Sequence, residues 1–215
     1  RTTSIMEKPM SSSQAWISQR GSSGHDRAYG LELSFTGDIY VVGTTDDALD
    51  GNEHHGQTDM FLMAFDSSGT WRWTRQRGSV KKDGATRVVQ NSDGFIFVAG
   101  RTFGALDGNI DDEGHHIFLM MFDSQGKWLW THQRGSTSRV WVNGLVLNPA
   151  GDAAFLSGFT EGSLDGQTYG EVGRDVFVMR FDIAAGKPSA ENPPLSVANR
   201  RIWMFAVIAS HLSWF

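Results

Sequence analysis

WTRQRGS at residues 73–79 and WTHQRGS at residues 130–136 differ at one position, and WISQRGS at residues 16–22 is a third, partial copy. The copies are separated by one fixed step of 57 residues. The positions that keep this step are Trp16, Trp73 and Trp130, and Gly21, Gly78 and Gly135. A motif that recurs at a constant period indicates a tandem array of one structural unit.

Other segments repeat with the same unit. The octapeptides DMFLMAFD, HIFLMMFD and DVFVMRFD occupy residues 59–66, 116–123 and 175–182. In the second copy, short runs rich in Val, Ile, Phe and Trp lie between turns that contain Gly or Asp, at residues 85–91, 95–101, 117–123 and 127–133. Their length, the β-branched and aromatic content and the lack of a 3.6-residue stripe predict strands rather than buried helices.

Four antiparallel strands per repeat, in tandem copies, are typical of β-propeller blades. The sequence therefore predicts an all-β fold of about three blades, as a partial or open propeller. The third run of the first two copies, MFLMAF and IFLMMF, is apolar at nearly every position, so we expect it to be covered on both sides. The predicted divisions are a lead-in (1–13), the repeat region (14–187), a Pro-containing linker (188–201) and an apolar tail (202–215).

The repeated motif has an expected structural role. A tryptophan can bury roughly 150–250 Å², which is enough to fill the gap between neighbouring blades. We expect the glycine to permit a sharp turn into the next blade, and the glutamine and arginine to satisfy backbone groups of the loops.

These segments resemble the SBBP family of β-propeller repeats. The resemblance rests on GSSGHDRAYGLELSFTGDIYVVGTT (21–45), DMFLMAFDSSGTWRW (59–73) and the matching stretches of the later copies, and it covers residues 14–187. The third copy departs from the pattern at Val140, where Asp is expected, by one extra residue near GDAAFLSG, and by IAAGKPSAEN in place of a last Gly-x-x-x-Trp. The resemblance implies a propeller, often in secreted or cell-surface proteins, with no common catalytic activity and no transferable functional residue.

Composition narrows the function classes. A net charge of −5 gives no overall basic footprint, so we expect no nucleic-acid partner. The chain has no cysteine, which excludes disulfides, thiolate metal sites and cysteine nucleophiles. The 14-residue apolar tail at 202–215 is shorter than the ~20 residues that a membrane span needs, which makes a membrane anchor the less favoured interpretation.

Loop length indicates where a ligand would bind. The connections between second and third strands are long, as in TTDDALDGNEHHGQTD (44–59), whereas the other turns are short. In an up-and-down sheet these long loops and the links between blades emerge at the same end, called here the long-loop face. Functional residues concentrate on such loops. The candidate binding residues there are Asp50, Asn52, Asp107, Asn109, Asp111 and Asp165.

Metal and cofactor signals are weak. DGNIDDEG (107–114) resembles the start of a calcium loop, but the sixth and twelfth positions are Asp112 and Phe118 rather than Gly and Glu. A repeated Asp-Gly after Leu is more simply a turn signal. The histidine pairs at 54–55 and 115–116 are out of register with one another. We therefore expect no metal site and no cofactor, with calcium as the alternative.

No nucleophile with an adjacent base and no unique pair of carboxylates stands out. Lys81, Lys82 and Arg139 are expected to be solvated. AFDSSGTWRW (64–73) is similar to the Ala-x-Asp-x-x-x-Gly-x-x-x-Trp motif of quinoprotein propellers, although one residue is missing between Asp66 and Gly69. An enzyme propeller, either a hydrolase or a quinone-dependent dehydrogenase, is thus the alternative to a non-catalytic binding or scaffold module.

The favoured interpretation is a module that presents its long loops to a protein or glycan. Propellers typically have four to eight blades, so three units predict further blades from a larger protein or self-association.

Overall fold

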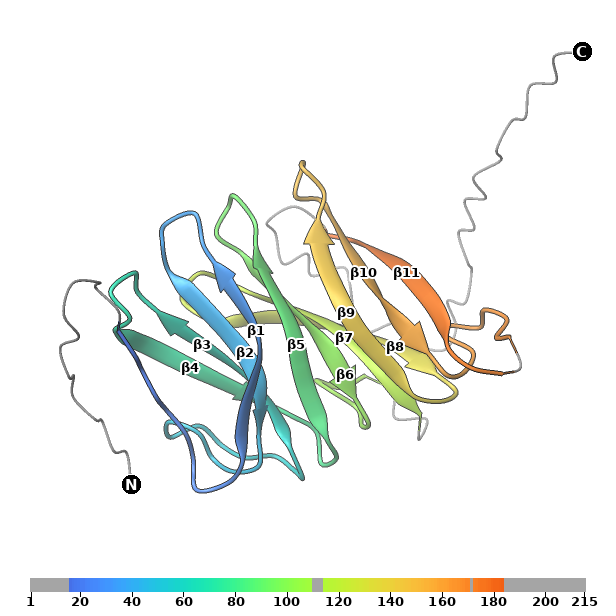
Figure 1. Ribbon diagram of the computed structural model, residues 1–215, viewed down its shortest axis with the longest axis horizontal. Helices are drawn as coiled ribbons and strands as arrows, with labels where there is room; N and C mark the ends of the chain where they lie inside the picture. The colour runs from blue at the N-terminus through green and yellow to red at the C-terminus, as the bar shows by residue number, and fades with distance from the viewer. Residues whose placement is uncertain (1–15, 110–113, 171, 184–215) are drawn as a thin grey trace, which may run out of the picture.

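The computed structural model describes residues 16–109, 114–170 and 172–183 of the 215-residue chain. These residues form eleven β-strands in three sheets and no helix (Figure 1). No helix in the described part of the chain is therefore long and apolar enough to cross a membrane. The predicted segments 1–13, 188–201 and 202–215 lie outside the described residues.

Each sheet contains consecutive antiparallel strands. Blade 1 consists of β1 (Asp26–Leu33), β2 (Ile39–Thr45), β3 (Asp59–Phe65) and β4 (Trp71–Arg77). Blade 2 consists of β5 (Asp83–Gln90), β6 (Ile96–Thr102), β7 (His115–Phe122) and β8 (Trp128–Ser136). Blade 3 consists of β9 (Val140–Leu147), β10 (Ala153–Thr160) and β11 (Asp175–Asp182), and the position of its predicted fourth strand falls beyond the described residues. The all-β fold of repeated blade-like sheets is confirmed.

The blades stack side by side, with blade 2 between blades 1 and 3 (Figure 1). The first strands β1, β5 and β9 contact one another in sequence along one side of the stack. A hydrogen bond from the Thr86 hydroxyl of β5 to the Val142 carbonyl of β9, at 2.8 Å, supports one of these contacts. The Gln90 amide of β5 also donates to the Tyr40 hydroxyl of β2 at 3.2 Å. We call β1, β5 and β9 the inner strands.

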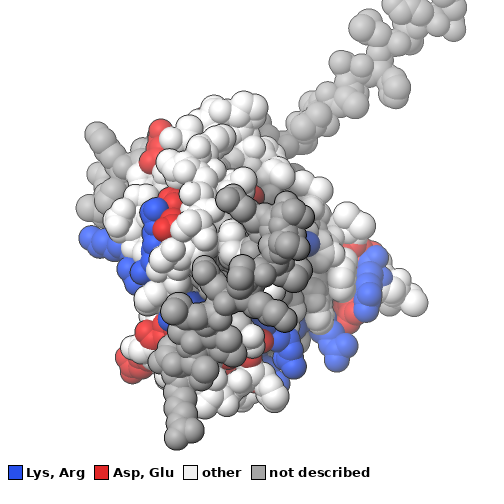
Figure 2. All heavy atoms as spheres, turned by 60° about the vertical axis from the view of Figure 1, so that its left-hand side comes forward, with Lys and Arg blue, Asp and Glu red and all other residues white. Residues whose placement is uncertain are grey.

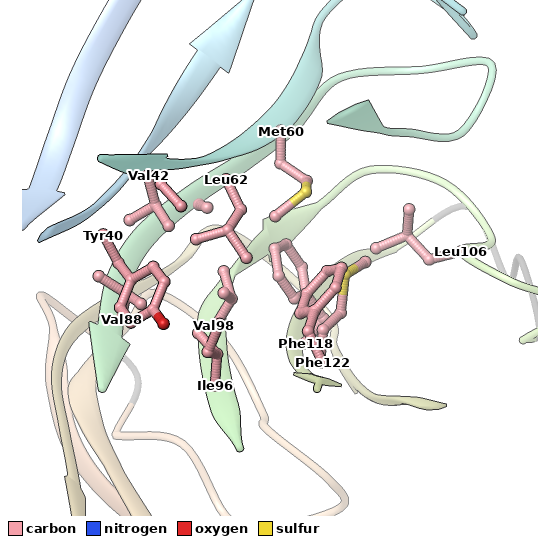
Figure 3. Packing of buried hydrophobic residues seen from close by; sticks show 13 residues of the cluster. Tyr40, Val42, Met60, Leu62, Val88, Ile96, Val98, Leu106, Phe118 and Phe122 are labelled. Atoms are coloured by element: carbon pink, nitrogen blue, oxygen red, sulfur yellow. The ribbon is translucent and has the colours of Figure 1, made fainter. Parts of the chain in front are cut away.

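Two apolar cores hold the stack together. Between blades 1 and 2, side chains of β2 and β3 meet side chains of β5, β6 and β7 (Figure 3). Between blades 2 and 3, the other side of β6 and β7 meets β9, β10 and β11. In the first two blades the third strand is covered on both sides, as predicted: in β7, Phe118 and Met120 belong to the first core, and Leu119 to the second. In blade 3, β11 is exposed on one side.

The loops follow the predicted pattern. The turns after the inner strands are short and contain Gly37, Gly94 and Gly151, whose φ angles of 85°, 85° and 72° an L side chain rarely adopts. The connections from the second to the third strand are long, at residues 46–58, 103–114 and 161–174. They emerge at the same end as the links between blades, which forms the long-loop face.

Candidate functional site

A cleft of about 1010 Å³ runs along the inner strands and opens toward the long-loop face. All three blades line it: Arg27 lies on β1, Arg87 on β5 and Trp141 on β9. The ends of the long loops and the links between blades complete the walls. No single blade could form this cleft, so it is a property of the stack.

The cleft carries an excess of positive charge. Its basic lining residues are Arg27, Lys82, Arg87, Arg101 and Arg139. Two carboxylates, those of Asp46 and Asp83, also line it. On the side of the molecule shown in Figure 2, Lys and Arg are interspersed with Asp and Glu. The cleft is thus locally basic in a chain whose net charge is −5.

Both carboxylates of the cleft are already engaged. Asp46 accepts a hydrogen bond from the Thr58 hydroxyl at 2.8 Å. Asp83 is buried and accepts from the backbone N–H and the hydroxyl of Ser79, at 2.6 and 2.9 Å. Burial raises the pKa of Asp83 above its ordinary value, which reduces its ability to balance the nearby cations at lower pH.

Arg101 is positioned by aromatic contacts. Its guanidinium lies 3.8 Å from the ring centre of Trp141 and 5.5 Å from that of Phe103. Trp141 is itself stacked on Phe159, at 5.5 Å between ring centres. None of the ion pairs found among the described residues involves Arg101, Lys82 or Arg139. Burial, followed by the charge of Arg139, lowers the pKa of Arg101 from its ordinary value, although the side chain stays protonated at neutral pH.

His115 lies beside these arginines at the start of β7. Its ring makes an edge contact with Phe103 at 4.5 Å between centres. Burial lowers the pKa of His115, and the charges of Arg101 and Arg139 lower it further. The imidazole is therefore neutral at pH 7.

Sequence reasoning missed these residues. Lys82 and Arg139 are exposed, in line with the expectation that they are solvated, but the sequence does not predict that both line one cleft. A signal was present, because residues 25, 82 and 139 are 57 apart and carry His, Lys and Arg. Each stands directly before an inner strand, so this repeat position is basic in every copy. Lys81 does not line the cleft.

The predicted binding residues lie elsewhere, in contacts within and between blades. Asp50 pairs with Arg20, with contacts of 2.5 and 3.2 Å, and accepts a 2.5 Å bond from Thr74. In the next copy, Asp107 pairs with Arg77 of blade 1 and accepts from Thr131. We call this ion pair the Arg–Asp staple. In both copies the arginine precedes, in the sequence, the blade that supplies the aspartate.

An indole completes the first two staples. The guanidinium of Arg20 lies 4.0 Å from the ring centre of Trp71, and that of Arg77 lies 4.4 Å from the ring centre of Trp128. The Trp71 indole N–H donates to Thr74 at 3.0 Å. The third copy is looser, since Arg134 and Asp165 are 3.8 Å apart and the Asp165 side chain is 57% exposed.

The same Asp residues shape the turn that the sequence predicted. Asp50, Asp107 and Asp165 have φ of 53°, 52° and 51°, and the glycine after each is also positive. Two consecutive positive φ angles characterise a type I′ turn. Asn52 and Asn109 close these turns, since each side-chain amide donates to the preceding leucine carbonyl at 2.7 Å.

None of the described binding candidates lines the cleft, and they are spread over three blades rather than gathered in one site. Asp111 lies outside the described residues. In the described part of the chain no group of three or more His, Cys, Asp or Glu side chains is arranged to hold a metal ion.

The structure also shows what the glutamine and the glycine of the repeated motif do. Gln76 and Gln133 accept hydrogen bonds from the backbone N–H groups of Leu49 and Leu106, at 2.8 and 3.1 Å, which confirms the expected role in the loops. The turn explanation for the glycine is wrong, because Gly21, Gly78 and Gly135 do not have positive φ. At Gly78 the reason is space: a Cβ atom would lie 2.0 Å from Oδ1 of Asp59.

The motif tryptophans contact the blade that follows them. Trp73 packs against the first core, and its ring lies over the turn glycine Gly126 of blade 2. Trp130 packs against the second core. Trp16 lies over Gly69 of blade 1 and is 47% exposed.

No protein-family model matches the chain. The chain is 28% identical over 140 residues to the regulatory protein FlaEY of Caulobacter vibrioides. This match covers 57% of the chain but 15% of FlaEY, so the chain spans a small part of that relative.

Proposed function

We propose that this chain is a non-catalytic binding module that holds a protein or glycan ligand in the cleft on its long-loop face. The observation that carries the proposal is that three blades contribute five cations to one concave surface, and that none of the five belongs to an ion pair found among the described residues. Binding sites are typically concave surfaces with a few converging polar groups. The blades then serve as a rigid scaffold for the cleft.

Two further points support binding over catalysis. The polar residues that the loops repeat are engaged in staples and turns, as described above, and so they are not free to act on a substrate. The curated relative is named a regulatory protein, and a module that acts by binding fits such a name.

The test compares variants at two ends of the molecule for their binding to arrays of proteins and glycans. The Lys82→Glu, Arg139→Glu double variant reverses two charges of the cleft. The control is Arg72→Glu, because Arg72 is half exposed at the opposite, short-turn end and pairs with Asp38 there at 3.2 Å. We expect the cleft variant to lose the ligands that the unchanged chain binds, and the control to retain them. If Arg72→Glu loses these ligands and the cleft variant keeps them, the proposal is wrong.

A further inference from the structure

Resting on the proposed function, we propose that the ligand of the cleft is an acidic oligosaccharide whose carboxylates bind Arg101, Arg139 and Lys82. The first reason is the uncompensated charge. Arg101 and Arg139 are close enough to affect one another electrostatically, and no carboxylate among the described residues pairs with either. Like charges held together destabilise the empty cleft, and a bound anion relieves that repulsion.

The second reason is the orientation of Arg101. Contacts with Trp141 and Phe103 restrict the position of its guanidinium before any ligand arrives. A planar guanidinium offers a fork of N–H donors that matches a carboxylate in a bidentate geometry. A fork restricted in this way loses little side-chain entropy on binding, which favours a carboxylate ligand.

The third reason is the chemistry of the remaining lining, which favours a sugar over a peptide. The side chains of Tyr29, Thr44 and Asn143 bring hydroxyl and amide groups to the cleft, and no hydrogen bond within the described residues occupies them. The rings of Phe103 and Trp141 are half-buried, and Arg101 lies over both of them. The exposed lining of the cleft is more polar than apolar, unlike the apolar pockets that anchor peptide side chains at protein interfaces. A ligand rich in hydroxyl groups and carboxylates suits this surface better.

The experiment is an isothermal titration of the full chain with a galacturonate hexamer. The matched probe is the same hexamer with its carboxylates methyl-esterified, which keeps the sugar backbone and removes the charge. We expect the acid to bind and the ester not to bind. Arg139→Gln should weaken binding of the acid tenfold or more, because hydrogen bonds between charged groups are worth about 1.5–3 kcal/mol. Arg139 is exposed, so this substitution spares the core.

Arg101→Lys tests the fork, since it keeps the charge and removes the planar geometry. We expect it to weaken binding of the acid, and near-unchanged binding would contradict a bidentate contact. Equal binding of acid and ester would overturn the role of the carboxylates. A hexaglutamate peptide or a short single-stranded DNA that binds more tightly than the hexamer would overturn the sugar assignment while leaving a binding module in place. Absence of hexamer binding, with array ligands still lost in the cleft variant, would likewise overturn the sugar alone.

Discussion

At the scale of single residues, Asp107 combines two functions that the sequence shows only in part. Its positive φ starts a type I′ turn, and its carboxylate joins Arg77 of blade 1 to Thr131 of blade 2. The Asp107 side chain is only 11% exposed. Hydrogen bonds to charged groups contribute more when they are shielded from water, so this staple should stabilise the contact between blades.

Asp107→Asn tests that role, because asparagine tolerates positive φ and keeps the shape of the side chain while removing the charge. We expect the free energy of unfolding to fall by about 1–2 kcal/mol, measured by urea denaturation. The matched control is Asp165→Asn at the loose third staple, where the exposed pair should contribute less than about 0.5 kcal/mol. Equal losses for the two variants would show that the staple itself contributes little.

The turn was predictable from sequence, but the staple was not. Leu-Asp-Gly recurs in each copy, and Asp-Gly is a local turn signal, so one short window was enough. The arginine partner of Asp107 is 30 residues earlier and on another blade. A pattern in one window cannot reveal a pair that forms only when blades stack. For this reason the aspartates were interpreted as ligand residues.

At the scale of elements, equivalent strands differ according to what covers them. Leu119 on β7 is fully buried against blade 3, whereas Val178, at the same place on β11, is 73% exposed. On the outer side of blade 3, Val146 and Val176 are exposed as well. The strand pattern alone therefore does not decide burial, and the neighbouring blade does.

This contrast makes a direct prediction. Leu119→Ala should lower the free energy of unfolding by about 2–5 kcal/mol, because it removes methyl groups from a packed core and leaves a cavity. Val178→Ala should change it by no more than about 0.5 kcal/mol, because that side chain already contacts water. Denaturant unfolding of both variants provides the measurement. A large loss for Val178→Ala would mean that its side of blade 3 is covered in solution.

Strand positions were predictable because apolar runs and turn residues are local features. The bulges in the inner strands were not predicted. In blade 2 the register shifts between Ala85 and Arg87, opposite Gly100, where a Cβ atom would lie 2.0 Å from the Gly84 carbonyl oxygen. This steric requirement becomes visible only when the two strands are paired.

The contact between β8 and β11 includes a titratable side chain, that of His132. The His132 ring lies between Trp130, in a tilted contact at 4.6 Å between ring centres, and Phe181, in a stacked contact at 6.2 Å. Burial lowers the pKa of His132 below the ordinary value of 6.5. Above pH 6.5 the histidine is neutral in the folded and unfolded chains, so its contribution to stability is complete. As the pH falls below 6.5, His132 takes up a proton in the unfolded chain before it does so in the folded chain. The folded chain therefore loses stability until the pH reaches the lower pKa that His132 has in the folded state.

We therefore expect the free energy of unfolding to decrease between pH 7.5 and pH 5.5, and to decrease less in His132→Phe, which keeps an aromatic ring without the titration. Urea denaturation at both pH values measures the difference. His115 titrates in the same direction, so His115→Gln is a useful second variant. If the unchanged chain and His132→Phe lose the same free energy, His132 does not contribute to the pH dependence.

At the scale of the whole molecule, the blades form a row in which each touches only its neighbours. Blade 2 is packed on both sides by the two apolar cores, while blade 3 is open on its outer side. The cleft follows the same row, because its walls come from the inner strands of all three blades. Local stability and ligand binding should therefore both depend on the contacts of blade 2.

Hydrogen exchange followed by mass spectrometry tests this organisation. Amides in well-packed strands exchange only through larger unfolding events, whereas those in strands with few contacts exchange through local opening. We expect the slowest exchange in β6 and β7, whose side chains are almost fully buried on both sides, and faster exchange in β11. Leu119→Ala should speed exchange in β10 and β11 more than in β2, because it weakens the second core and leaves the first intact. Uniform acceleration across all three blades would instead mean that the row unfolds as one cooperative unit.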